Sequence, residues 1–280
     1  MLLPHVHGTN LENKFKATSD TDLGQCLSEY QKFRDTIASL SRDAPYFVED
    51  AVKALNAYRE NAIPILEKRK NSGQENLRST ILEEFFVHLF QDVLEKFHDD
   101  SGYYIGKGTS YISLSFAPKN FDDLENDPGL QVTVKDSDFT IGCLFDLSIS
   151  DIDKTNVSEK KILVPAIAIE CKTYIERNML DSCAGTATQI KKANPYCLYT
   201  VAAEFMKLED SSPELTDIDE VYILCRASNS ERLENQKSGN IHPIHADLVR
   251  DLNERIRSHL NRLWWDPATA LDAGKIIRRP

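Results

Sequence analysis

The sequence lacks the features that mark membrane, secreted and zinc-ribbon proteins. No apolar run approaches the ~20 residues of a membrane-spanning helix. The first residues, MLLPHVHGTN, contain no basic region followed by an apolar core, so we expect no signal peptide. The six cysteines include no Cys-x-x-Cys pair, which disfavours a zinc site. These absences predict a cytoplasmic protein with reduced, buried thiols.

The chain also lacks an excess of positive charge. It has 33 Lys and Arg against 44 Asp and Glu, a net charge of −11, which argues against a non-specific polyanion binder. The charge is uneven, because residues 221–280 hold ten basic against seven acidic side chains. DNA binding through a local basic surface is therefore compatible with the composition, and it should weaken at high salt or without metal.

The remaining composition is that of a globular protein, with 41% hydrophobic and 28% charged residues in 280 positions. No internal repeat or low-complexity segment is present. Apolar residues recur at helical spacing over 22–40, 46–70, 74–97 and 246–265. We expect a helical region at 1–73 that contacts DNA or mediates dimerisation, a core at 74–226, and a polar loop with a basic helix at 227–280.

Two apolar segments carry the candidate chemistry. Ile162–Tyr174 resembles a strand buried on both faces, and it contains Glu170 and Lys172 two positions apart. Side chains alternate along a strand, so these two charges share one face while Cys171 lies on the other. Thr140–Ser150 is predicted to be a strand that carries Asp146 among apolar neighbours. Carboxylates and an ammonium at adjacent strand ends are costly to desolvate, and a divalent cation would offset that cost.

Glu83 is a further candidate on the apolar helix at 74–97. On a helical wheel it falls inside the stripe of Phe86, Val87, Phe90 and Leu94, whereas Glu84 falls outside it. A carboxylate within an apolar face is unusual and indicates either a site or a side chain that escapes at the edge of the sheet. A helix at 181–193 and strands at 197–203 and 220–226 complete the predicted core.

This order of elements, with Asp146 followed by Glu-x-Lys, resembles the PD-(D/E)xK nuclease superfamily. FDLS matches the motif around the metal-binding aspartate, ECK matches Glu170 and Lys172, and LEE matches the acidic residue of the first core helix (Glu83). Phe145 replaces the proline of the motif. The resemblance covers roughly residues 74–226, and within the superfamily the chain is most similar to Type II restriction endonucleases of the BbvCI kind.

The resemblance implies an α/β fold with a restriction-endonuclease-like core, a central mixed sheet flanked by helices. It also implies that Asp146, Glu170 and the carbonyl of Cys171 bind Mg2+, and that Lys172 positions or deprotonates a water. Glu83 would hold a second metal or orient a water. The implied partners are double-stranded DNA and either a related second subunit or a second copy, each subunit cutting one strand.

DNA contacts are expected from polar and basic side chains that follow the core strands. Gln189, Lys191 and Lys192 on the predicted helix at 181–193 would hold the phosphate backbone. Bases would be read from the segments 175–181 and 227–240. The candidates there are Arg177, Asn178, Arg226, Asn229, Arg232 and Lys237.

Three other functions remain compatible with the sequence. One is a structure-selective repair or recombination nuclease with the same fold. Another is a non-catalytic DNA-binding subunit that keeps the Glu-x-Lys pair as a structural ion pair. The third is a protein-interaction scaffold that docks partners on its helical N-terminal region.

Overall fold

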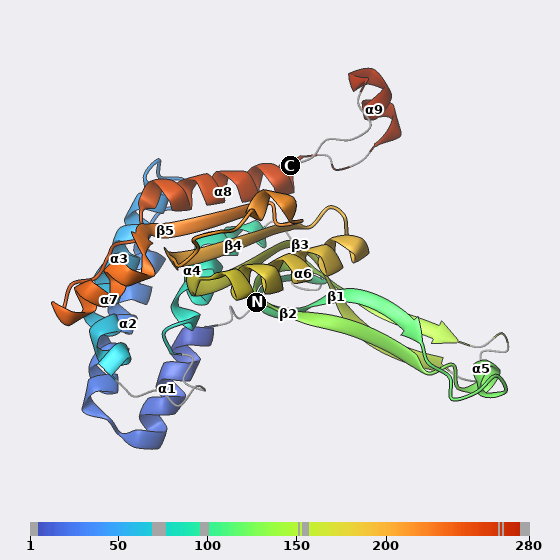
Figure 1. The fold of residues 1–280 in the computed structure, drawn as a ribbon, viewed down its shortest axis with the longest axis horizontal. Helices are drawn as coiled ribbons and strands as arrows, with labels where there is room; N and C mark the ends of the chain where they lie inside the picture. The colour runs from blue at the N-terminus through green and yellow to red at the C-terminus, as the bar shows by residue number, and fades with distance from the viewer. Residues whose placement is uncertain are drawn as a thin grey trace.

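The protein was analysed in a computed structural model, drawn in Figure 1. The structure describes residues 5–68, 77–95, 101–150, 152, 157–262, 264 and 266–274. The predicted boundary between residues 73 and 74 lies outside these residues. Among the described helices, none has the length and apolar character needed to cross a membrane.

A five-stranded mixed sheet forms the centre of the molecule, in the order β1-β2-β3-β4-β5. The strands are β1 (Tyr103–Phe116), β2 (Leu130–Ser150), β3 (Val157–Ile175), β4 (Leu198–Met206) and β5 (Glu220–Ser228). β1, β2 and β3 pair antiparallel in sequence order, whereas β3, β4 and β5 are parallel. The predicted fold, a mixed sheet flanked by helices, is confirmed.

Helices cover both faces of this sheet. α6 (Arg177–Ala193) connects the parallel strands β3 and β4 and packs Leu180, Ala187 and Ile190 against Ala168 and the buried residues of β4. α4 (Thr80–Phe90) covers the other face, where the rings of Phe86 and Phe90 lie 5.9 and 5.8 Å from that of Phe139 in β2. The wide apolar arc of α4 follows from this position between the sheet and other helices.

The N-terminal helices share one hydrophobic core with α4 and the sheet. They are α1 (Val6–Thr18), α2 (Thr21–Ser39) and α3 (Phe47–Lys68), and α8 (Ala246–Asn261) packs beside α3. Residues such as Leu23, Leu55 and Leu252 are fully buried there. The helices predicted at 22–40, 46–70 and 246–265 are therefore present with small shifts at their ends.

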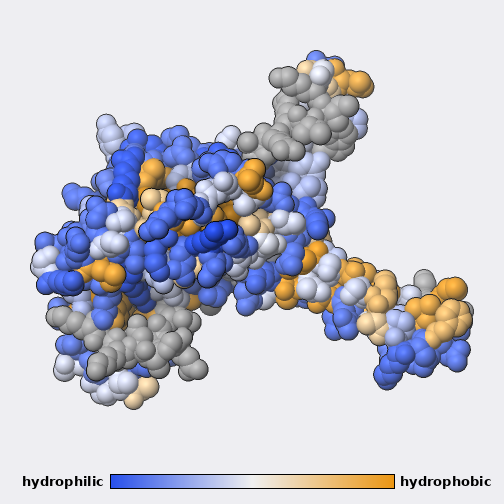
Figure 2. Space-filling view, in the orientation of Figure 1, coloured by the Kyte–Doolittle hydropathy of each residue, from blue (hydrophilic) through white to orange (hydrophobic). Residues whose placement is uncertain are grey.

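β1 and β2 extend beyond the sheet as a long arm with the short helix α5 (Asp123–Asn126) at its tip (Figure 1). Hydrophobic surface lies along this arm in Figure 2, and the exposed side chains of its outer part include Phe116, Phe121 and Leu124. β2 begins at Leu130 rather than at the predicted Thr140. Because of this earlier start, β2 contains Asp138 as well as Asp146.

The polar stretch at 227–240, predicted to be a loop, is largely the helix α7 (Asn229–Lys237). Ser228 and Glu231 form a reciprocal capping box: each side chain bonds to the backbone N–H of the other residue. Two orphan donors of the first turn are thereby satisfied, which explains a helix start in such a polar segment. The chain then passes through α8 to the short helix α9 (Pro267–Ala273). Trp264 stacks on Tyr196, as expected of a packing anchor.

Candidate active site

The antiparallel pairing of β2 and β3 brings Asp138 next to Glu170 and Lys172. Phe139 lies opposite Ile169, so Asp138 is in the adjoining position opposite Glu170. The carboxylate of Asp138 accepts the backbone N–H of Cys171 at 2.9 Å and lies 3.8 Å from the ammonium of Lys172. That ammonium donates to Glu170 at 2.5 Å. Asp138, Glu170 and Lys172 thus form one charged group on two neighbouring strands.

Glu83 and Lys107 join this group from α4 and β1. The ammonium of Lys107 donates to Glu83 at 3.1 Å and lies 3.7 Å from Asp138. Lys107 sits at an irregularity of the β1–β2 ladder between Gly106 and Gly108, and Gly106 has a φ of 121°. A side chain at Gly106 would be strained at this φ, so the glycine permits the bulge that turns Lys107 toward the carboxylates.

The site holds three carboxylates against two ammonium groups, and most of them are largely buried. Burial, reinforced by the charge of Asp138, raises the pKa of Glu83 to about 7. The same two causes raise the pKa of Glu170 above its ordinary value. Burial alone would lower the pKa of Lys172, but the charge of Glu170 raises it. The uncompensated carboxylate charge favours a cation beyond the two lysines.

The donor set fits Mg2+. Asp138, Glu170 and Glu83 offer hard carboxylate oxygens, the ligands this ion prefers, and no thiolate or imidazole nitrogen takes part in the contacts of the group. The ammonium groups of Lys107 and Lys172 lie between these carboxylates and hold them together. Such a group can bind a divalent cation and present an ammonium beside it.

Asp146, the predicted metal-binding aspartate, lies elsewhere, and the prediction that it shares an ion with Glu170 is wrong. It is opposite Lys161, whose ammonium lies 3.8 Å away, and its side chain is 83% exposed. Lys161 precedes Glu170 by nine positions on β3, which corresponds to roughly 30 Å at ~3.3 Å per residue. The cause is geometric: in a hairpin, positions near the turn on one strand face positions near the turn on the other.

The same geometry contains the signal that identifies Asp138. Because β2 ends at Ser150 and β3 begins at Val157, the partner of Glu170 must lie about as far before the end of β2 as Glu170 lies after the start of β3, close to residue 138. A strand that starts at Thr140 does not contain Asp138, so the sequence prediction could not place this aspartate beside Glu170. Lys107 was missed because an isolated lysine between glycines carries no periodic signal.

The other predicted core residues lie as follows. Glu170 and Lys172 share a face and contact each other, while Cys171 is buried in the core that includes α4. Glu83 reaches the site through Lys107, whereas Glu84 bonds to Tyr30 and Gly8 on another side of α4. Glu83 is therefore the one of the two glutamates that faces the site.

The predicted DNA contacts on α6 are divided between its two ends. Arg177 and Asn178 are exposed in its first turn, immediately after β3. Gln189, Lys191 and Lys192 lie in its last turns, at the opposite end. The ammonium of Lys191 bonds to Asp219 at 2.6 Å, and its contact with the phosphate backbone stays a prediction. Gln189 and Lys192 are exposed and stay predictions.

The predicted base-reading residues around α7 also differ in their surroundings. Arg232 donates to Glu67 and to Asn229, each at 3.0 Å, and lies over the ring of Phe205, and its assignment to base reading stays a prediction. Asn229 uses its side-chain oxygen in the same contact. Arg226 is exposed and pairs with Asp247, and Lys237 is exposed. Arg226 and Lys237 stay predictions.

The chain is similar to known proteins in sequence and in fold. The family model described as Bpu10I restriction endonuclease matches residues 74–276. A solved chain titled "native BbvCI A2B2 tetramer at low resolution" has a similar fold, with a TM-score of 0.66 and 21% sequence identity. The similarity covers 92% of this chain and 97% of that chain. A search of curated proteins found no match.

Proposed function

The chain belongs to the Bpu10I restriction endonuclease family, and on that premise we propose that it is a Mg2+-dependent subunit of a Type II enzyme with a PD-(D/E)xK active site. It would hydrolyse phosphodiester bonds of double-stranded DNA at a short specific sequence, one strand per subunit. The observation that supports this most directly is the convergence of Asp138, Glu170 and Lys172 on adjoining strands. This is an Asp followed by Glu-x-Lys, with Asp138 in the place that the sequence pattern had given to Asp146.

Each side chain has a role that follows from its position. Asp138, Glu170 and the carbonyl of Cys171 would hold the ion, and Glu83 would hold a second one or orient a water. Bound Mg2+ supplies polarisation of the scissile phosphate and a lowered pKa of bound water. Lys172, fixed by Glu170 and kept protonated by its raised pKa, would position the attacking water or neutralise charge that develops on the phosphate, rather than deprotonate the water. Lys107 would balance the charge of Glu83 and Asp138.

We propose a second, related subunit as the partner. The solved relative is titled an A2B2 tetramer, an assembly of two kinds of chain, and this chain resembles it over nearly its full length. A recognition site that is nearly palindromic would then be shared between two similar but different halves. Reading of bases is proposed for exposed polar residues near the site, Arg177 and Asn178 first, because they directly follow the strand that carries Lys172.

Digestion of supercoiled plasmid with Mg2+ tests this function. We expect discrete nicks, or discrete double-strand cuts when the second subunit is present, and sequencing of the ends should show one common site. Lys172→Ala should lower cleavage by a factor of ~10²–10⁴ while DNA binding in Ca2+ remains. Asp138→Asn should abolish cleavage, and the matched Asp146→Asn should leave it unchanged.

The outcomes separate the alternatives. Cuts at branched or flapped DNA regardless of sequence would indicate a structure-selective nuclease. DNA binding without cleavage in the folded protein would indicate a non-catalytic subunit. Loss of cleavage in Asp146→Asn but not in Asp138→Asn would refute the site described above.

A further inference from the structure

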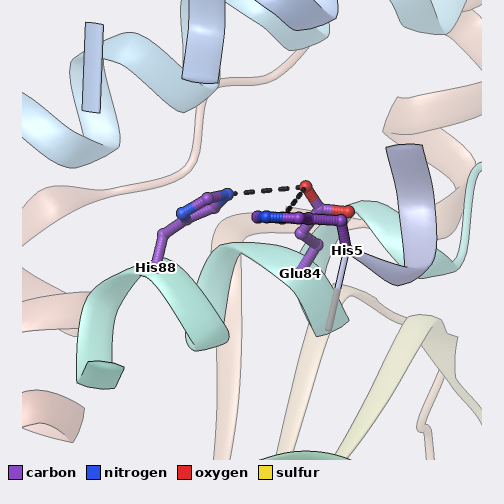
Figure 3. Close-up of side chains that lie close together, drawn as sticks. All are labelled: His5, Glu84 and His88. Carbon is purple, nitrogen blue, oxygen red and sulfur yellow. Dashed lines mark ion pairs between the residues drawn. The ribbon is translucent and has the colours of Figure 1, made fainter. Parts of the chain in front are cut away.

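Two histidines and a glutamate gather on the side of α4 that faces the N-terminal helices. Glu84 and His88 are one helical turn apart on α4, and His5 immediately precedes α1 (Figure 3). The His88 Nε2 and the His5 Nδ1 each lie 3.4 Å from the same oxygen of Glu84. All three ligand atoms lie within 4.8 Å of one another. The group is separate from the catalytic carboxylates, because Glu84 and the neighbouring Glu83 contact different elements.

These separations match the geometry of a transition-metal site. Bonds of 2.0–2.1 Å to tetrahedral Zn2+ place two donor atoms about 3.3 Å apart. The spacing of Glu84 and His88, four residues on one helical face, is the spacing that lets two side chains of a helix share one ion. His5 approaches from a separate segment, so the three donors converge from two directions toward one point.

The Glu84 oxygen is the near partner of both histidine nitrogens, and at 3.4 Å each contact is long for a hydrogen bond. His88 is 6% exposed, and its Nε2 and the Nδ1 of His5 are buried without a hydrogen bond of acceptable geometry. An ion placed between the two nitrogens and the carboxylate oxygen would contact all three atoms.

The carboxylate of Glu84 is held in place and kept ionised. Its two oxygens accept the Tyr30 hydroxyl at 2.5 Å and the Gly8 backbone N–H at 2.9 Å. Burial alone would raise the pKa of Glu84, but contacts with His5, His88 and Tyr30 lower it well below its ordinary value. Arg34 is the cation beside the group, with its guanidinium 3.4 Å from the Nε2 of His5. The hydrogen bonds that Tyr30 and Gly8 donate to Glu84 are typical of outer contacts that orient a metal ligand. The Arg34 guanidinium can only donate, so it does not play this part for His5.

We propose that His5, Glu84 and His88 bind one Zn2+ ion or a similar late first-row divalent ion. Two imidazoles and a carboxylate favour such ions over Mg2+. Three protein ligands leave a fourth position for water, and the 27% exposure of the His5 side chain gives the ion a route from solvent. The bound ion fastens the start of α1 to α4, the helix that also carries Glu83. No cysteine takes part, so the absence of Cys-x-x-Cys pairs does not exclude this zinc site.

Zinc binding by the full chain tests the site. The purified protein is stripped with EDTA, desalted and titrated with ZnCl2 against a chromophoric chelator. We expect one tightly bound Zn2+ per chain and a rise in Tm. His5→Gln and His88→Gln should each weaken binding by at least about a hundredfold and remove the rise in Tm. Bound Co2+ should give the visible spectrum of a tetrahedral site without a thiolate charge-transfer band.

Two matched variants separate this site from the catalytic one and from other histidines. Asp138→Asn and His245→Gln should keep the zinc affinity of the wild type. If His88→Gln fails to fold, His5→Gln decides the question, because His5 lies at the partly exposed start of a helix. No zinc binding by the wild type, unchanged binding in His5→Gln, or loss of binding in Asp138→Asn would each overturn the proposal.

Discussion

The two lysines of the candidate active site differ in how they are held. Lys172 is fixed on a central strand, with Glu170 as its nearest partner. Lys107 is placed by a bulge on β1 and is 43% exposed. Lys107 contacts both Glu83 and Asp138, so changing it tests whether these carboxylates must be held together for cleavage.

Substitution of Lys107 should lower cleavage without unfolding the protein. Lys107→Ala removes the ammonium that bridges Glu83 and Asp138, so these carboxylates lose the contact that holds their positions in the site. We expect roughly a hundredfold loss of cleavage rate at saturating Mg2+, the usual effect of removing one electrostatic group from an active site. Rates on a plasmid substrate measure it.

Lys161→Ala is the control for this prediction, because Lys161 is an exposed lysine of the same sheet paired with Asp146. It should cleave DNA like the wild type. Equal activities of Lys107→Ala and the wild type would show that the contact between Lys107 and Glu83 has no catalytic role.

At the residue scale, the sequence predicted what local alternation determines. Glu170 and Lys172 lie two apart on one strand, so their shared face follows from the strand period alone. Asp138 depends on the register between two strands, which depends in turn on where the hairpin turns and on a bulge between Ile141 and Gly142. The residue pattern of a single strand indicates neither the position of the hairpin turn nor the position of the bulge.

Among the helices, α7 depends most visibly on its cap. Ser228→Ala removes the side-chain acceptor for the N–H of Glu231 and should destabilise the protein by about 1 kcal/mol. Urea unfolding monitored by circular dichroism gives this value. Ser230→Ala, in the exposed first turn of the same helix, should be neutral or slightly stabilising. Equal effects of the two variants would contradict the role of the capping box.

Elements were predictable where the apolar period was strong. α2, α3 and α8 appear close to the predicted positions because each has a continuous apolar stripe. α7 has no buried residue, so its sequence shows no apolar period and predicts a loop. α6 starts at Arg177, whereas the predicted start was residue 181. Its N-cap residue, Glu176, makes no side-chain cap, so no capping motif in the sequence indicates the true start. For α7, the sequence does contain a helix-start motif, because Ser228 and Glu231 have the spacing of a capping box.

At the scale of the whole molecule, a buried ion-pair network joins the N-terminal helices to the sheet. Glu204 of β4 is 3% exposed and binds Arg59 of α3 and Arg78 just before α4. Glu67 of α3 binds Arg78 and also Arg232 of α7. This network, together with the shared hydrophobic core, holds the N-terminal helices against the part of the chain that carries the candidate active site.

The network predicts a loss of stability in acid. Burial alone would raise the pKa of Glu204, but the charges of Arg59 and Arg78 lower it below its ordinary value of 4.5. The unfolded chain therefore takes up a proton at higher pH than the folded one. The stabilisation is complete above pH 4.5 and is lost as the pH falls through the folded-state pKa. Unfolding free energies measured from pH 7 to pH 3 should show this decline.

Removal of one partner should destabilise the molecule more than any surface change. Arg59→Met leaves the Glu204 carboxylate buried with Arg78 as its remaining close partner, and we expect a cost of about 3–5 kcal/mol. Adding Glu204→Gln removes the buried charge and should recover part of that cost, so the two effects should not be additive. Denaturant unfolding of both single variants and the double variant measures the coupling. Additive effects would mean that Arg59 and Glu204 are not coupled and that their ion pair does not help to hold α3 against the sheet.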